Sequence, residues 1–277
     1  MEKNKNFLVI KKENKKFAYG GNQAWFNKKS AQVGGCGVIA AVNAFWGLIW
    51  KDKEFAKKFG IEIGEDGSLP FDIYKKWMEF VYQKMGTIEL PIYRDFYNKT
   101  GEKYQWQRWI RPSYGMSYIR YIYRSIAFAG ERRVYLKCQK MATAYCSKKK
   151  TMQFIGKGLK KAGTVTVLVS GGGQKIEMVE SGEVKSVKNH FYVITDLHKN
   201  KEGNWELEGS SWGQKFKISF EDWHKSYQTI FAKGSGMIYF IKAKDEEESR
   251  REALKSLFFI LGNTLAVIRG LFCKKTS

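Results

Sequence analysis

The sequence predicts an α+β protein in which helices come first and an antiparallel β-sheet follows. Two patterns along the chain lead to this prediction. In the N-terminal part, apolar residues recur every three or four positions, as they do on one face of a helix. From Gly163 onwards, runs of β-branched and aromatic residues alternate with turns that contain Gly or Asn. A hydrophobic content of 43% supports a packed core and excludes a disordered chain.

The helix that begins at Cys36 is the clearest of the predicted helices. It extends to about Trp50, because Val38, Val42 and Phe45 recur on one apolar face. Residues 86–115 are predicted to be irregular, with many aromatic side chains and several turn signals. Further helices are expected at residues 53–58, 68–85, 118–128 and 151–161.

The sheet is predicted from β-branched or aromatic runs, each bounded by a turn. These runs are residues 164–169, 190–195, 205–211, 215–220 and 237–242. Residues 171–189 are expected to form a long flexible loop, because the glycines at 171–173 lack the spacing of a phosphate-binding loop. Ser219 and Asp222 belong to a capping box that opens a short helix ending near Tyr227.

Residues 1–245 are expected to form one domain, followed by a tail at residues 246–277. The tail begins with acidic residues and continues with a mostly apolar stretch, 257–272, flanked by basic residues. This stretch is shorter than the roughly 20 apolar residues that cross a bilayer. It suits a helix that lies on an anionic membrane surface or binds a partner, and a helix that packs back on the domain is the alternative.

The net charge of +22 comes from abundant lysines that are spread along the chain. They form no long run and accompany no nucleic-acid motif, so we predict a solvated surface and no specific nucleic-acid partner. Of the four cysteines, Cys138 and Cys146 have poor zinc spacing, and no Cys-x-x-Cys pair occurs. We therefore expect reduced thiols, a cytoplasmic location, no metal and no cofactor. The apolar run at 7–10 is too short for a signal-peptide core.

Cys36 lies between Gly35 and Gly37, where the helical pattern begins. Unpaired N–H groups and the helix dipole favour negative charge at a helix N-terminus, so this position favours a thiolate. The flanking glycines allow another backbone or a substrate to approach closely. The residues alone leave two interpretations, a nucleophile or a small buried side chain in the core.

A histidine that activates Cys36 must be one of only three in the chain. His190 is the candidate, because it starts a strand directly after the long loop, whereas His198 lies in a charged turn and His224 is expected to be solvated in the short capped helix. Asp196 shares the strand of His190, but six strand residues span about 20 Å, so it cannot touch the imidazole. The next strand must supply the partner.

A Gln residue, Gly-Cys-Gly at the start of a helix, His at the start of a strand, and Ser210-Ser211-Trp212-Gly213 follow one another in this chain. This order resembles the papain-like cysteine peptidase superfamily and its C39-like relatives over residues 20–242. It is most similar to an uncharacterised bacterial subgroup with Gly-Gly-Asn-Gln-x-Trp-Phe. The resemblance implies that the N-terminal helical part, with the helix that begins at Cys36, packs on the C-terminal antiparallel sheet.

The resemblance also implies roles for single residues. Cys36 is the nucleophile, His190 the base, and Ser210 stands where the family has an Asn that orients the histidine. Glu208, on the same strand face as Ser210, is the alternate for that role. Gln23 is expected in the oxyanion hole, with Gln32 as its alternate. Trp212 would shield the orienting residue from solvent.

The implied activity is hydrolysis of a peptide or related amide through a thioester. The first alternative is a catalytically weak or inactive relative that binds a peptide or protein partner, because Ser210 replaces the family's Asn. The second is a basic protein that binds a membrane surface or nucleic acid, with Cys36 incidental. Fast alkylation of Cys36 below pH 7 would favour the enzyme, since a free thiol titrates near 8.5.

Overall fold

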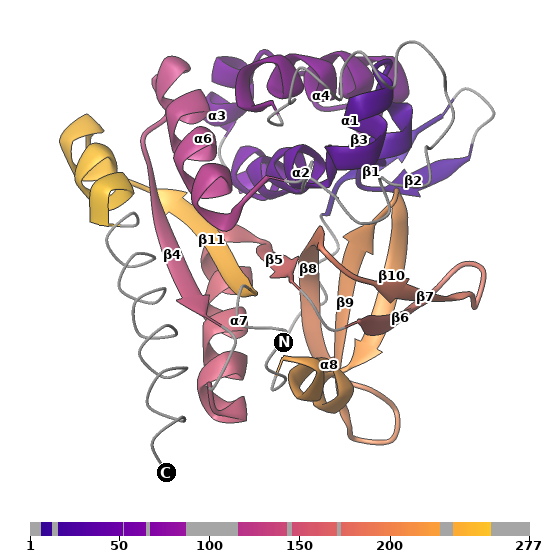
Figure 1. Cartoon of the computed structure of the whole chain (residues 1–277). Helices are drawn as coiled ribbons and strands as arrows, with labels where there is room; N and C mark the ends of the chain where they lie inside the picture. The colour runs from indigo at the N-terminus through magenta and orange to yellow at the C-terminus, as the bar shows by residue number, and fades with distance from the viewer. Residues whose placement is uncertain are drawn as a thin grey trace, which may run out of the picture.

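The computed structural model describes residues 7–12, 16–51, 53–64, 67–86, 116–142, 146–170, 173–227 and 235–255. Over these residues the protein is a mixed α+β structure with a large antiparallel sheet, which confirms the predicted fold class at that level (Figure 1). Residues 87–115 and 257–272, which hold most of the predicted irregular segment and the apolar part of the tail, lie outside the described residues.

The large sheet, in the part of the chain that the structure describes, has eight strands in the order β4-β11-β5-β8-β9-β10-β6-β7. Every neighbouring pair in it is antiparallel. The strands are β4 (Leu136–Ala142), β5 (Val165–Val169), β6 (Gln174–Met178), β7 (Val184–Val187), β8 (His190–Lys199), β9 (Trp205–Ser211), β10 (Gln214–Ser219) and β11 (Gly236–Lys242).

Helices cover both faces of this sheet near β11. Phe240 lies against Phe45 of α2 (Cys36–Lys51), whereas the adjacent Tyr239 lies against Phe154 of α7 (Lys148–Ala162). Successive strand residues point to opposite faces, so α2 and α7 lie on opposite sides of the sheet. This double cover explains why β5 is almost wholly buried along its length.

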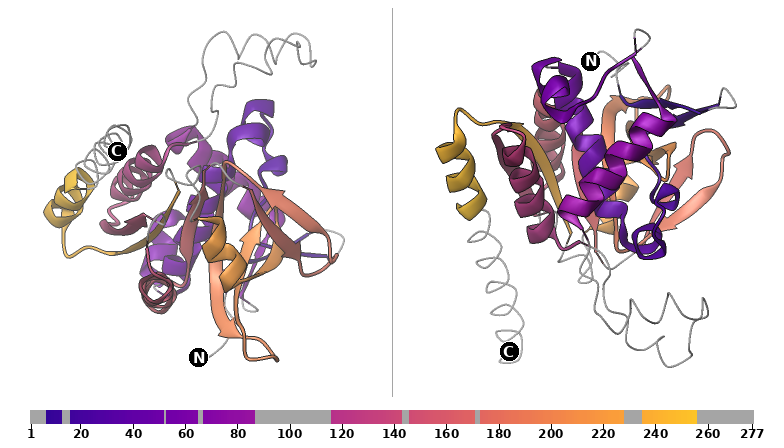
Figure 2. Two further views of the ribbon diagram at one scale, coloured as in Figure 1. Left: turned by 60° about the horizontal axis from the view of Figure 1, so that its bottom comes forward. Right: turned by 90° about the horizontal axis from the view of Figure 1, so that it is seen from above.

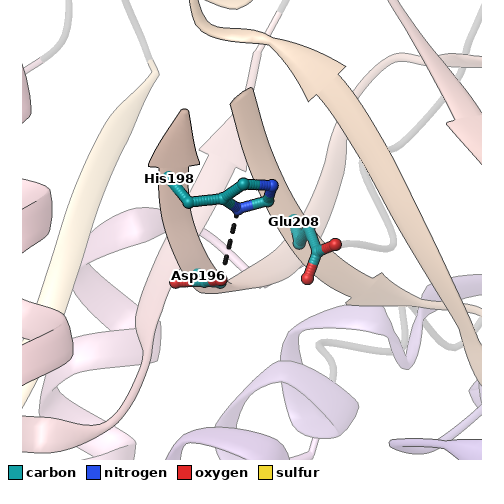
Figure 3. A group of neighbouring side chains, drawn as sticks. All are labelled: Asp196, His198 and Glu208. Atoms are coloured by element: carbon teal, nitrogen blue, oxygen red, sulfur yellow. Dashed lines mark ion pairs between the residues drawn. The ribbon is translucent and has the colours of Figure 1, made fainter. Parts of the chain in front are cut away.

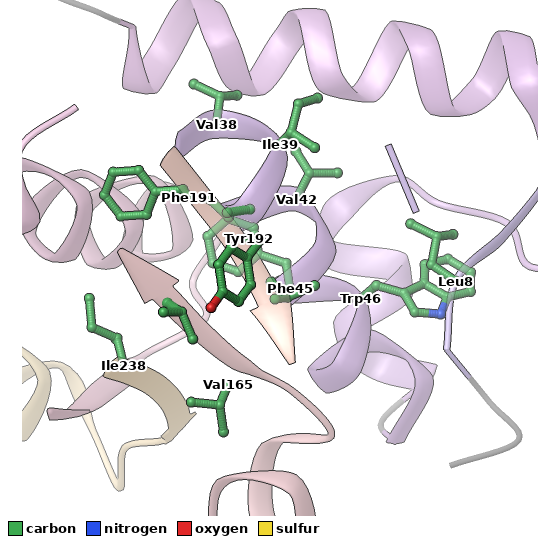
Figure 4. Packing of buried hydrophobic residues seen from close by; sticks show 14 of the residues in the cluster. Leu8, Val38, Ile39, Val42, Phe45, Trp46, Val165, Phe191, Tyr192 and Ile238 are labelled. Carbon is green, nitrogen blue, oxygen red and sulfur yellow. The ribbon is translucent and has the colours of Figure 1, made fainter. Parts of the chain in front are cut away.

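The helix α2 is the centre of the core. Its apolar residues are buried except for the partly exposed Trp50, and they meet side chains of β5, β8 and β11 (Figure 4). On its other side it contacts α3 (Lys53–Phe59), α4 (Phe71–Met85) and α6 (Tyr118–Glu131). A helix that is apolar nearly all round is stable only when it is enclosed in this way. Cys36, its first residue, is thereby fixed against the sheet.

A smaller sheet and short elements complete the N-terminal part. The small sheet has the order β2-β1-β3, with β1 antiparallel to β2 and parallel to β3. The backbone N–H of Tyr19 donates to the carbonyl of Gly213, and this bond ties the small sheet to the turn after β9. The remaining elements are β1 (Val9–Lys11), β2 (Phe17–Tyr19), β3 (Ser68–Pro70), η1 (Gln23–Trp25), α1 (Lys29–Gly34) and α8 (Phe220–Ser226).

The sequence prediction is wrong for residues 171–189, because most of this predicted loop is a hairpin. Strands β6 and β7 pair there in antiparallel register, and β6 continues the sheet beside β10. Figures 1 and 2 show the hairpin projecting from the body of the molecule. In β6 the outward Lys175 and Glu177 alternate with the buried Ile176 and Met178, but this pattern is short, and β7 exposes Val184 and Ser186 and buries only Val187. The edge strand β4 was also not predicted.

The first part of the tail packs back on the domain. Residues 246–255 are helical, and the Ser249 hydroxyl donates to the carbonyl of Leu136 at 2.7 Å. The Lys137 ammonium lies 2.7 Å from the Glu248 carboxylate. The beginning of the tail therefore covers the outer edge of the sheet at β4. Across the described ranges, none of the helices is sufficiently long and apolar to traverse a membrane.

Candidate active site

Cys36 is placed by the junction between two consecutive helices. α1 ends at Gly34, and α2 begins two residues later at Cys36. A side chain at Gly35 would put its Cβ 2.4 Å from the carbonyl oxygen of Ala31, so only glycine fits between the two helices. Cys36 itself is only 6% exposed. The sequence prediction that it begins a buried helix is confirmed.

His190 is the first residue of β8, and it lines one small cavity together with Cys36. Its Nε2 is 2.8 Å from the hydroxyl oxygen of Ser211. Its ring stacks on Trp212, with centroids 4.6 Å apart and planes 21° from parallel. The preceding Asn189 has φ +49°, in the left-handed region that Asn tolerates best after Gly. Two contacts and a sharp turn therefore hold the imidazole in one orientation.

Ser211, and not Ser210, contacts His190. Val193 pairs with Ser210 across β8 and β9, so these two side chains share a face of the sheet. The side chain of His190, three residues before Val193, points to the opposite face, and so does that of Ser211. The prediction that Ser210 orients the histidine rested on the resemblance, which places it where the family has an Asn, and it is wrong because the register of β9 on β8 turns Ser211 to the face of His190.

Ser210 belongs to a buried polar network of its own. Its hydroxyl donates to the carbonyl of Tyr19 at 2.7 Å and lies 3.5 Å from the amide nitrogen of Asn43. The Asn43 side-chain oxygen accepts from the N–H of Gly21 and from the hydroxyl of Tyr74. These bonds join β9, α2, α4 and the segment after β2. Ser210 therefore holds together the elements that surround the cavity.

Gln23 also lines the cavity, but its amide group is engaged elsewhere. Its Nε2 donates to the carbonyl of Gln32 at 2.8 Å and lies 3.3 Å from that of Val33. Its Oε1 is buried, with no hydrogen-bond partner in the described parts of the chain. Gln32 donates its own amide to the carbonyl of Phe26. In this state Gln23 braces the turn before Cys36, and Gln32 is absent from the described residues that line the cavity.

The alternate Glu208 lies too far along β9 to orient His190. It pairs with Asp196 across the strands, and its Oε2 is 2.5 Å from the Lys215 ammonium. Glu208 is likewise missing from the described residues around the cavity. Of the predicted site residues, Cys36, His190, Ser210 and Gln23 meet at one cavity, whereas Glu208 and Gln32 lie outside it.

The cavity is small and its two titratable groups are buried. Its volume of about 10 Å³ has room for about one water. Burial raises the pKa of the Cys36 thiol, and this outweighs the backbone N–H groups that donate to the sulfur. Burial lowers the pKa of the His190 imidazole to about 4. Both effects favour a neutral thiol beside a neutral imidazole at neutral pH. The described residues lining the cavity are Gln23, Cys36, Ile39, Ala40, Asn43, His190, Phe191, Tyr192, Ser210, Ser211 and Trp212.

Comparison of the sequence with known protein families gives no matching family model, and comparison with curated proteins gives no significant match. The chemistry of the cavity therefore has to be inferred from its own geometry. A thiol at a helix N-terminus, an imidazole and a hydroxyl on that imidazole are the groups from which acyl-transfer sites are built.

Proposed function

We propose that this chain is a papain-like, C39-like cysteine hydrolase that cleaves a peptide or related amide. One observation carries the proposal: Cys36, His190 and Ser211 line one cavity, and the histidine is held by the serine at 2.8 Å. The nucleophile comes from the start of a helix, and the histidine and its partner come from two neighbouring strands. This arrangement fits the order of roles that the sequence resemblance implies.

The first chemical step joins the Cys36 sulfur to the carbonyl carbon of the amide. The Nε2 of His190 is engaged with Ser211, so Nδ1 is the nitrogen that accepts the thiol proton. His190 then gives this proton to the departing amine as the carbon–nitrogen bond breaks. A water molecule, activated by the same nitrogen, hydrolyses the thioester to a free acid and restores the thiol.

The oxyanion of each tetrahedral intermediate needs hydrogen-bond donors. The N–H of Cys36 is one candidate, because residues in the first turn of a helix have no intrahelical partner for this group. The amide of Gln23 becomes the second donor when it turns away from the carbonyl of Gln32. Each such donor contributes roughly 3 kcal/mol in comparable sites.

Ser211 takes the role that the sequence resemblance gives to Ser210. In the proposed mechanism its hydroxyl is the acceptor for Nε2–H, which leaves Nδ1 to act as the base. Trp212 stacks on the ring and covers it. A hydroxyl stabilises an imidazolium less than a carboxylate does, which agrees with a low pKa for His190. We therefore expect general-base activation of a neutral thiol and not a resting ion pair.

A second candidate function is peptide or partner binding without cleavage. The observation that favours it is the small cavity, which has room for about one water, together with the burial that keeps both groups neutral. In either case the proposed partner is a peptide or protein. The free thiols of Cys36 and Cys138 fit a cytoplasmic location, which stays a prediction. Contact with an anionic membrane through residues 257–272 also stays a prediction.

Cleavage of a proteome-derived peptide mixture tests the proposal across many candidate substrates at once. Wild-type protein and Ser210→Ala are expected to generate new peptide termini, detected by mass spectrometry. Cys36→Ala and His190→Ala are expected to generate none, although both keep the wild-type circular dichroism spectrum. Equal cleavage by Cys36→Ala would refute the hydrolase. Peptides that wild type and Cys36→Ala retain equally, without cleavage by either, would support the binding function instead.

A further inference from the structure

Four ionisable side chains form a block on one face of β8 and β9, well along the strands from His190. Asp196 pairs with Glu208 across the two strands, and His198 pairs with Glu206. Directly opposed side chains on one face lie about 5 Å apart. Figure 3 shows Asp196 and His198 on one strand and Glu208 on the next, with a dashed line that marks the ion pair between Asp196 and His198.

A β-bulge creates this block. The register between β8 and β9 shifts between Ile194 and Asp196, so Thr195 is an extra residue in β8. Without the bulge, simple alternation would place Asp196 on the same face as His190. With it, Asp196 and His198 share a face with Glu208. The bulge therefore brings a histidine and carboxylates together, and the sequence alternation alone would separate them.

The spacing of these groups fits a metal ion. The Asp196 Oδ2 and His198 Nδ1 atoms are 3.2 Å apart. Two ligand atoms each about 2.0–2.1 Å from a tetrahedral zinc ion lie about 3.3 Å from one another. One ligand atom from each of Asp196, His198 and Glu208 lies within 4.8 Å of the others. Small side-chain rotations would bring all three to bonding distance.

Asp196 and Glu208 are each anchored through one carboxylate oxygen, and the other oxygen of each can bind an ion. Asp196 Oδ1 accepts the N–H of Leu197 at 2.8 Å. Glu208 Oε2 lies 2.5 Å from the Lys215 ammonium. Asp196 Oδ2 and His198 Nδ1 are buried and, apart from their 3.2 Å contact with one another, neither makes a hydrogen bond to a described residue. Asp196 is only 6% exposed, so its inward oxygen has little access to solvent.

The second imidazole nitrogen of His198 also has a carboxylate beside it. Its Nε2 lies 3.6 Å from Glu206 Oε1. A histidine that binds a metal through one nitrogen usually donates its other N–H to a carboxylate, which fixes the ring and raises its basicity. Glu206 occupies the position of such a supporting carboxylate. His198 and Glu208 are partly exposed, which leaves an entry path for an ion.

We propose that Asp196, His198 and Glu208 bind a divalent transition-metal ion, with Zn²⁺ preferred, and that Glu206 positions His198. One imidazole and two carboxylates suit zinc, whereas calcium and magnesium select oxygen ligands alone. Water fills the fourth position. The ion ties β8 to β9, the strands that carry His190 and Ser211. Because zinc binds only the folded state in this proposal, it raises the melting temperature of the protein. At zinc concentrations above Kd, this rise follows the logarithm of the zinc concentration.

Zinc titration of the full chain near neutral pH, followed by calorimetry, tests this site. We expect one equivalent of Zn²⁺ to bind, and Cys36→Ser to bind it equally. Glu206→Gln is expected to weaken the affinity roughly 10- to 100-fold. Asp196→Asn and His198→Gln, which remove ligands, weaken it further. Glu177→Gln is the matched control, because Glu177 is a partly exposed carboxylate that pairs with Lys217 outside the block.

Histidine ¹H–¹⁵N correlation spectra of the wild-type protein provide a test that does not depend on any variant folding. Zinc is expected to shift Nδ1 of His198 and to leave the ring nitrogens of His190 and His224 unchanged. The proposal is overturned if no equivalent binds, if His198→Gln and Asp196→Asn bind as tightly as wild type, or if the shifts appear at another histidine. Each of these results would make the block a histidine that bridges two carboxylates without a metal.

Discussion

The buried His190 makes a specific prediction about stability at acidic pH. Burial lowers the pKa of its imidazole to about 4, whereas an unfolded histidine titrates near 6.5. Between these two values the unfolded chain holds a proton that the folded chain lacks, so the free energy of unfolding rises with pH in this window. The contribution of His190 is complete above pH 6.5 and is lost as the pH falls toward 4. At about 1.4 kcal/mol per pKa unit, it amounts to about 3 kcal/mol.

Urea denaturation of wild type and His190→Gln across this pH window measures the contribution. The wild type is expected to lose about 3 kcal/mol more than His190→Gln between pH 6.5 and 4, because glutamine does not titrate. Ser210→Ala is the matched control, since it removes a buried polar group from the same cavity and leaves the imidazole in place. Its unfolding free energy is expected to run parallel to that of wild type. Parallel curves for wild type and His190→Gln would refute the reasoning.

Four further predictions follow from packing and hydrogen bonding. Gly35→Ala is expected to lower the unfolding free energy by about 1–3 kcal/mol or more, because its Cβ would meet a backbone oxygen at 2.4 Å. Gly156→Ala, where α7 leaves open space, is expected to raise it by about 0.5–1 kcal/mol, and a loss there would contradict this account. Ser249→Ala is expected to lower the unfolding free energy by about 1 kcal/mol, because it removes the hydrogen bond to Leu136 of β4. No change would show that the tail does not pack on β4. In peptide cleavage, Ser211→Ala is expected to lower kcat by roughly 5- to 100-fold and shift its pH profile, whereas Ser210→Ala lowers stability with an unshifted profile.

The parts of the fold with strong local patterns were predictable from the sequence. The helix from Cys36 is apolar on nearly every side and is enclosed as that pattern requires. The strand from His190 is a continuous buried run in the middle of the sheet. These two elements bring the thiol and the imidazole to one cavity, so the main pair of candidate residues was within reach of sequence reasoning.

The details that depend on strand pairing were not predictable. Whether Ser210 or Ser211 faces His190 is decided by the register of β9 on β8, which no local pattern records. The bulge at Thr195 likewise moves Asp196 to the other face. A signal for the second site was present, since Asp-x-His on one strand and Glu-x-Glu on the next each repeat with the period of a strand face. Only the paired register shows that these two signals belong together.

The rate of Cys36 alkylation by iodoacetamide against pH, in wild type and in His190→Ala, tests the central claim that these residues act as a pair. Between about pH 5 and 8, neutral His190 is expected to accept the thiol proton and keep the wild-type rate roughly 100-fold above the variant. Without the imidazole, the buried thiol with its raised pKa is expected to react only as the pH approaches alkaline values. Superimposable slow profiles for the two proteins would contradict the pairing and leave Cys36 as a core residue.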